Sequence, residues 1–254
     1  MSIKGRTRFT VAGTHPLLKL TRDHFIKQGF ALIPWDSEEK PHFCLIGADL
    51  HGSDQLPLAQ LELQRMQSVG CRVLLLSTQE LAAGTEPVNW DELGPDTVAS
   101  LLYARCAEHM FTYQDDSPPP VILRPVNIYG PDINWGVINY AFNNARRGEV
   151  LRNPGIREAV STFLHQEDYL RYVDNFVFTG FHGAYNVAST EPCSYHNVLR
   201  NIWKFINGPD TEPTIVDSGH PLMNFIPDTQ QLELSADWKP KTTIRSGLFK
   251  MAQS

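Results

Sequence analysis

The stretch that most constrains the fold of this chain is residues 121–131, Val-Ile-Leu-Arg-Pro-Val-Asn-Ile-Tyr-Gly-Pro. Apolar residues behind a run of prolines predict the start of a buried strand, and Gly130-Pro131 ends it with turn-forming residues. Arg124 and Asn127 are thereby placed at the carboxyl end of the strand, the edge where open α/β sheets bind ligands. A buried strand with a polar tip and no ligand accounts for the same pattern.

The beginning of the chain has the pattern of a βαβ unit. Residues 8–13 predict a strand, Pro16 can begin an amphipathic helix, and Gly29 can end it. Residues 30–34 predict a second strand, and Asp36 follows, where a carboxylate can bond a ribose hydroxyl. This order is typical of dinucleotide-binding folds.

The rest of the chain continues to alternate strands and helices. We expect helices over residues 54–69, 97–113, 136–148, 168–178 and 194–206. We expect strands over residues 71–78, 183–189 and 213–216. Residues 150–160 are interpreted as a loop. The fold class predicted from this alternation is α/β with a parallel sheet.

Several motifs resemble one known family. Arg124-x-x-Asn127-x-Tyr-Gly-Pro is similar to the sixth-strand motif of the extended short-chain dehydrogenase/reductases, the NAD-dependent nucleotide-sugar epimerase/dehydratase family. The segment containing Phe163, His165 and Asp168 and the Gly-x-Tyr-Asn-Val strand at residues 183–187 resemble it too.

This resemblance covers about residues 9–248 and implies a Rossmann-like doubly wound parallel sheet with a small C-terminal substrate-type α/β subdomain. Residues 1–130 would form the first part of the core. Residues 131–254 would hold the remaining core elements, interleaved with the small subdomain.

The phosphate-binding loop departs from the family pattern. Of its three glycines only Gly13 survives, while Pro16 and Lys19 stand at the other two positions. Pro16 removes a backbone N–H donor, and both side chains are expected to fill space that the family leaves empty. Too few residues follow Asp36 for the helix and strand that the family has there. Gly13 and Asp36 are therefore interpreted as vestigial cofactor-binding positions.

The catalytic positions implied by the resemblance are also incomplete. Tyr103 falls at the family's active-site tyrosine, but the lysine position one turn later is Ala107, and no lysine lies between Lys40 and Lys204. Without an ammonium to lower its pKa, Tyr103 is expected to be a poor base, and a packing tyrosine explains it equally well. Thr78 is an approximate match to the catalytic Ser/Thr.

The resemblance makes Arg124 and Asn127 the candidate substrate-binding residues, with Asn127 near the diphosphate of a nucleotide sugar. The arginine that would clamp a substrate phosphate is replaced by Ser161. Arg124 can equally be a buried structural arginine.

We hypothesise that the chain is a divergent member of this family that has lost NAD(P)-dependent redox catalysis. It would act as a pseudoenzyme: a ligand-binding protein, a partner subunit or a cofactor-independent protein, with a pure interaction module as a further reading. No cofactor is then expected. The alternative is an active NAD(P)-dependent nucleotide-sugar epimerase, dehydratase or reductase with an atypical site. The expected partners are a nucleotide sugar or another small molecule, and a second copy or a different protein in a dimer.

Composition excludes other classes of function. The net charge is −6 with no basic run, which argues against nucleic-acid binding. No apolar run approaches the roughly 18 residues that a membrane span needs, and the N-terminus lacks the apolar core of a signal peptide. The four cysteines are widely spaced, so we expect reduced thiols, no metal site and a cytoplasmic location.

Overall fold

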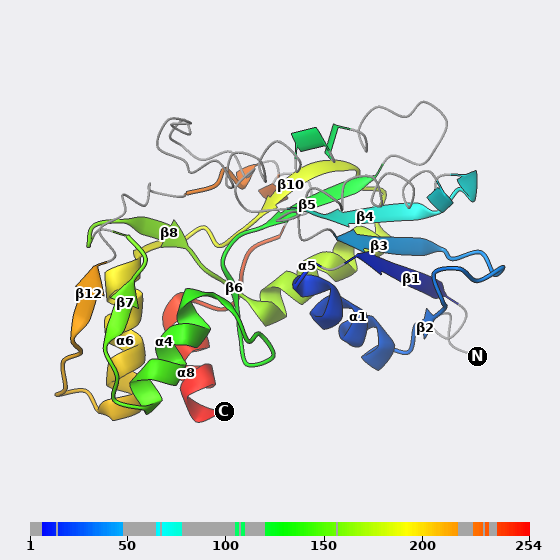
Figure 1. Ribbon diagram of the computed structural model, residues 1–254. Helices are drawn as coiled ribbons and strands as arrows, with labels where there is room; N and C mark the ends of the chain where they lie inside the picture. Colours follow the sequence, from blue (N-terminus) through cyan, green and yellow to red (C-terminus); the bar gives the residue numbers. More distant parts are fainter. Residues whose placement is uncertain are drawn as a thin grey trace. The chain divides into compact units, whose positions relative to one another are not determined.

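A computed structural model describes most of the chain in two compact units, which are treated separately below (Figure 1). The described residues are 7–13, 15–47, 65–66, 68–77, 105–106, 108–109, 120–155, 157–217, 226–230, 232–233 and 238–254. Unit 1 comprises Met1–Ala82, Val88–Pro125 and Tyr172–Asn186. Unit 2 comprises Ala83–Pro87, Val126–Arg171 and Val187–Ser254.

Unit 1 is built on a six-stranded sheet with the strand order β10-β5-β4-β3-β1-β2. Its elements are β1 (Arg8–Gly13), α1 (Leu17–Lys27), β2 (Ala31–Leu32), β3 (Phe43–Gly47), β4 (Arg72–Leu76), β5 (Val121–Pro125) and β10 (Gly183–Val187). The pairs β1/β2, β1/β3, β3/β4 and β4/β5 are parallel. Every residue of β3 is buried, as in a parallel sheet covered on both faces. The predicted doubly wound parallel sheet is confirmed.

The chain reverses its direction of progress across the sheet at β1. β2 lies on one side of β1 and β3 on the other, and residues 33–42 between them form neither a helix nor a strand. The predicted shortening after Asp36 is confirmed, and it leaves the two-residue β2 as the edge strand. The carboxyl ends of β1 and β3 form the topological switch point, where ligands bind in open α/β sheets.

Hydrogen bonds join two helices of unit 1. Helix α5 (Gln166–Phe178) begins in unit 2, and its last residues belong to unit 1. Asp174 on α5 bonds His24 Nε2 at 2.8 Å and Gln28 Nε2 at 3.0 Å, both near the end of α1. Arg72 donates to the backbone carbonyls of Val177, Thr179 and Phe181. It therefore satisfies carbonyls at and just beyond the C-terminus of α5 and ties them to β4.

Unit 2 packs three helices beside short strands (Figure 1). Its elements are β6 (Ile128–Tyr129), α4 (Gly136–Arg146), β7 (Leu151–Asn153), β8 (Val160–Thr162), β9 (Leu164–His165), β11 (Pro192–Ser194), α6 (Tyr195–Asn207), β12 (Ile215–Asp217) and α8 (Ile244–Gln253). The described strands pair as β11/β8, β12/β7 and β6/β9. Phe142, Leu199, Ile202 and Leu248 form part of the core between the helices.

The interpretation of residues 150–160 as a loop is wrong. β7 and the start of β8 lie there, and β7 pairs in parallel with β12, with Leu151 opposite Ile215. A three-residue strand is too short to show a periodic pattern of apolar residues. Its partner β12 lies far along the chain, so no neighbouring residues indicate the pairing either. Ser194 is the N-cap of α6, because the Asn197 N–H donates to Ser194 Oγ at 3.2 Å. Within the described residues, no helix combines the length and hydropathy that a bilayer crossing requires.

Candidate functional site

Two glycines form the switch point of unit 1. Gly13 and Gly47 end β1 and β3 as register partners. A Cβ on Gly13 would lie 1.9 Å from the backbone oxygen of Gly47, and a Cβ on Gly47 would lie 2.5 Å from Cβ of His15. Gly13 also has a φ of +101°, which disfavours any other residue. A side chain therefore fits at neither position, and of the two glycines Gly13 is exposed while Gly47 is buried.

His15 caps the N-terminus of α1. Its Nδ1 accepts a hydrogen bond from the Leu17 N–H at 3.2 Å, and its carbonyl accepts one from the Leu18 N–H at 2.9 Å. Its own N–H donates to the Gly47 carbonyl at 3.1 Å. Pro16, at the N-cap, has no N–H to offer. The amides that would face a phosphate here are thus bonded to His15.

This cap corrects one detail expected from the sequence. Pro16 and Lys19 were expected to fill the loop, yet both are exposed. The atoms nearest to a Cβ on Gly47 belong instead to His15 and Leu18. Sequence reasoning did not single out His15, because its role is a bond between a side chain and the backbone two residues on.

The switch point fits a dinucleotide in part. Gly13 is exposed at the end of β1, and Asp36 is exposed in the turn after the adjacent strand β2. A backbone approach and a carboxylate for a ribose hydroxyl are therefore both present. The amides of the first turn of α1 are present as well, although His15 occupies them.

A buried ion pair lies at the tips of β4 and β5. Glu108 is 6% exposed, and its carboxylate accepts from Arg124 Nε at 2.9 Å and from Arg124 Nη2 at 2.6 Å. Ser77 Oγ, just after β4, donates to the same carboxylate at 2.6 Å. Asn186 Oδ1 lies 3.5 Å from Arg124 Nη1, a long contact. The pair is bidentate and shielded from water, which is the strong geometry for arginine and carboxylate.

This arrangement commits the charge of Arg124 to Glu108. The structure places Arg124 where the sequence predicted, at the carboxyl edge of the sheet, but as a paired arginine. Glu108 was not predicted, because an acid inside an amphipathic helix resembles any solvated surface acid. What distinguishes Glu108 is its burial, and burial of an acid cannot be predicted from the sequence when its partner, Arg124, is not known. Tyr103, Thr78 and Ala107 lie outside the described residues.

Asn127 is bonded within unit 2. Its φ is +42°, a left-handed conformation that asparagine tolerates better than most residues. Its Nδ2 donates to Ser161 Oγ at 2.7 Å and to the Thr162 carbonyl at 3.1 Å. Ser161 stands where the resemblance implies a phosphate-clamping arginine. The amide donors of Asn127 are therefore used to hold β8 beside the β5–β6 connection.

His165 and Asp168 are buried in unit 2. The Glu167 N–H donates to His165 Nδ1 at 3.3 Å, while no described atom bonds His165 Nε2. Burial lowers the pKa of His165, against an opposing effect of Glu167. Asp168 accepts from the backbone N–H groups of Lys241 and Thr242 at 3.0 and 2.8 Å. Asp168 thus fixes the segment that leads into α8.

No family model and no curated protein matches this chain in sequence. Solved structures match its fold. They include UDP-N-acetylglucosamine 4-epimerase from Bacillus cereus, with 16% identity and a TM-score of 0.77 over 97% of this chain and 98% of that one. MoeE5 in complex with UDP-glucuronic acid and NAD has 16% identity, a TM-score of 0.76 and the same coverage. The dTDP-glucose 4,6-dehydratase from Bacillus anthracis in complex with NAD has 15% identity and a TM-score of 0.73 over 97% of this chain and 95% of that one.

These comparisons show that the chain has the fold of nucleotide-sugar epimerases and dehydratases. They also correct the expectation that no cofactor binds. MoeE5 and the dehydratase share this fold and were solved with NAD bound. An altered glycine pattern in the loop is therefore insufficient ground for excluding a dinucleotide.

We predict that Glu108→Ala destabilises the fold by about 3–5 kcal/mol, since it leaves Arg124 buried without its counter-ion. The measurement is urea unfolding of the variant, of Arg124→Met and of the double variant. Because the two side chains share one interaction, the double variant should lose clearly less than the sum of the single changes.

The matched control for this cycle is Glu39→Ala, which removes an exposed ion pair with Arg8 at 3.1 Å and should cost below about 1 kcal/mol. Equal losses of unfolding free energy in Glu108→Ala and Glu39→Ala would show that the Glu108–Arg124 pair stabilises the fold no more than an exposed ion pair does.

A second prediction concerns pH. The folded-state pKa of His165 lies below its unfolded value, so the unfolded chain takes up the proton first as pH falls. The free energy of unfolding should then decrease below about pH 6.5, by up to about 1.4 kcal/mol per pH unit. His165→Phe should flatten this slope in urea unfolding between pH 7 and 5. Phe163→Leu, a nearby core change without a titratable group, should lower stability and leave the slope intact.

Proposed function

We propose that this chain binds NAD(P) and a nucleotide-sugar ligand but lacks the tyrosine–lysine proton relay of the enzymes whose fold it shares. The observation that carries the proposal is the switch point, where the exposed Gly13 ends β1 next to β3 and shortly before the N-terminus of α1. The bound NAD of two fold neighbours supports a dinucleotide as the ligand.

Within the described residues, Gly13, the α1 N-terminus and Asp36 would hold the dinucleotide. NAD(P), when bound, supplies hydride exchange at its nicotinamide. Gly13 would allow close approach of the pyrophosphate, and Asp36 would accept a hydrogen bond from a ribose hydroxyl. His15 would have to release the Leu17 amide for that amide to contact phosphate.

Loss of proton transfer is the second half of the proposal. No lysine lies between Lys40 and Lys204, so no ammonium from that part of the sequence can lower the pKa of Tyr103. Arg124 is paired with Glu108 and does not offer a substitute cation. We therefore propose a binding protein of this fold, with Tyr103 and Thr78 as lining residues only. Asn127 would contact the nucleotide sugar, and pairing with a second copy or another protein stays a prediction.

Calorimetric titration of the full chain with NAD+ and with NADP+ tests the first half. We expect saturable binding of one of them, and at a hundredfold excess over its Kd a stabilisation of about 2.7 kcal/mol. Adding UDP-glucose or UDP-N-acetylglucosamine to the loaded protein should leave the nicotinamide oxidised. Failure of both dinucleotides to bind would refute the proposal. Reduction of the nicotinamide would instead favour the alternative, an active enzyme with an atypical site.

A further prediction concerns His15. His15→Ala frees the Leu17 amide, so the Kd for the dinucleotide should fall by about fivefold, because the roughly 1 kcal/mol needed to release one neutral hydrogen bond is no longer spent. The matched control is His42→Ala. The His42 Nδ1 also accepts from a backbone N–H, that of Arg8 at 3.0 Å, but just before β3 at the opposite edge of the sheet. Equal affinity in both variants would rule out a competing role for His15.

A further inference from the structure

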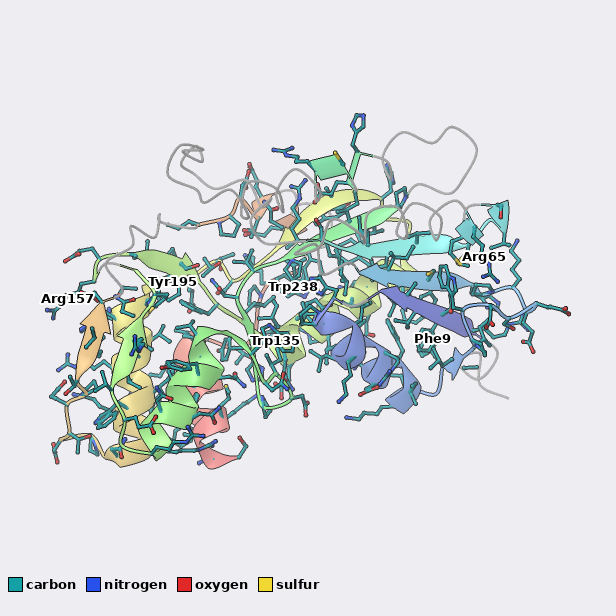
Figure 2. The ribbon with its side chains drawn as sticks, viewed as in Figure 1. Phe9, Arg65, Trp135, Arg157, Tyr195 and Trp238 are labelled. Atoms are coloured by element: carbon teal, nitrogen blue, oxygen red, sulfur yellow. The ribbon has the colours of Figure 1, made fainter. Side chains whose placement is uncertain are left out.

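A cavity of unit 2 lies apart from the positions discussed above. It has a volume of about 270 Å³ and lies between α6, β12 and the loop after β7. Its lining residues are Arg157, His196, Arg200, Glu212, Pro213 and Ile215. Figure 2 labels Arg157 on the β12 side of unit 2. None of these residues belongs to the carboxyl edge of the unit 1 sheet.

Arg200, one cation of the cavity, forms a surface ion pair with Glu212, in which the two side chains are 48% and 56% exposed. The Glu212 carboxylate accepts from Arg200 Nε at 2.8 Å and from Arg200 Nη2 at 2.6 Å, and Lys204 Nζ lies 2.9 Å from it. The hydrogen bond from Arg200, followed by that from Lys204, lowers the pKa of Glu212 to about 2. These three side chains are charged at neutral pH and sum to one positive charge. Arg200 is therefore oriented without being fully neutralised.

The other donors of the cavity are Arg157 and His196. Neither the Arg157 nor the His196 side chain makes a hydrogen bond or ion pair with another described residue. His196 lies one turn before Arg200 on α6, so both side chains project from the same face of the helix. Two uncommitted nitrogen-bearing side chains and a pre-oriented guanidinium thus converge on one small space.

The chemistry of these groups selects an oxyanion. Guanidinium groups bind the planar oxygens of phosphate and carboxylate through paired, charge-assisted hydrogen bonds. The volume is just below the range typical of drug-sized ligands, so a phosphate group with a small attached moiety is the size that fits. Pro213 and Ile215 give an apolar wall for that moiety.

We propose that this cavity is a second ligand site, which binds the phosphate group of a small metabolite through Arg157, His196 and Arg200. Glu212 is a positioning residue that sets the guanidinium of Arg200. The site is independent of the dinucleotide at the switch point, and the proposal holds whether or not NAD(P) binds.

The test is calorimetric titration of the full chain with inorganic phosphate at constant ionic strength, with the dinucleotide present in excess. We expect saturable binding in the wild type. Arg157→Gln and His196→Gln should each weaken it at least tenfold. Arg245→Gln, an equal charge change at an exposed position of α8, should leave the Kd unchanged.

Two outcomes would overturn the proposal. Absence of saturable phosphate binding in the wild type would do so directly. Equal weakening in Arg157→Gln and Arg245→Gln, which remove the same charge, would do so as well, because it would indicate attraction by net charge alone. Thermal unfolding without phosphate verifies that each variant is folded. His196→Asn, a smaller polar replacement, serves if His196→Gln is unstable.

Discussion

The ion pair between Glu108 and Arg124 is the interaction that fixes the polar groups at the carboxyl edge of the unit 1 sheet. A carboxylate and a guanidinium this far from water are stable only because each satisfies the other, with Ser77 as a further donor. The pair joins the tip of β5 to Glu108, which has helical backbone. It also weakens the attraction of Arg124 for a phosphate group, because the charge of the guanidinium is neutralised by Glu108.

The fold was largely predictable because its signals are local. The buried apolar runs at β4 and β5, the helix between Pro16 and Gly29, and the short connection after Asp36 could each be predicted from a few neighbouring residues. The strand β7 has no such local signal, because what defines it is its pairing with β12, a distant segment of the chain. Short strands with distant partners are therefore the part of this fold that sequence periodicity misses.

The candidate site was predictable by position and not by partner. The motif placed Arg124, Asn127, Gly13 and Asp36 at strand ends, where the structure has them. It could not show that Arg124 bonds Glu108, or that Asn127 bonds Ser161, since each pair is separated in sequence. At position 161 the resemblance implies an arginine, and the structure has a serine whose hydroxyl accepts a hydrogen bond from the side-chain amide of Asn127. The altered glycine pattern was likewise insufficient ground for excluding a cofactor, since neighbours with this fold were solved with NAD bound.

Two interactions at the sheet edge, the hydrogen bond from the Leu17 amide to His15 and the ion pair of Arg124 with Glu108, differ in the free energy that a ligand needs to break them. Releasing the Leu17 amide from His15 costs about one neutral hydrogen bond, roughly 1 kcal/mol, because water or a phosphate can replace the imidazole. Releasing Arg124 from Glu108 would leave a buried carboxylate unpaired, at about 3–5 kcal/mol. A ligand bound with micromolar affinity has about 8 kcal/mol in total, so the first cost weakens binding about fivefold and the second more than a hundredfold. Within unit 1, the Leu17 amide is therefore easier to release for a ligand than the guanidinium of Arg124.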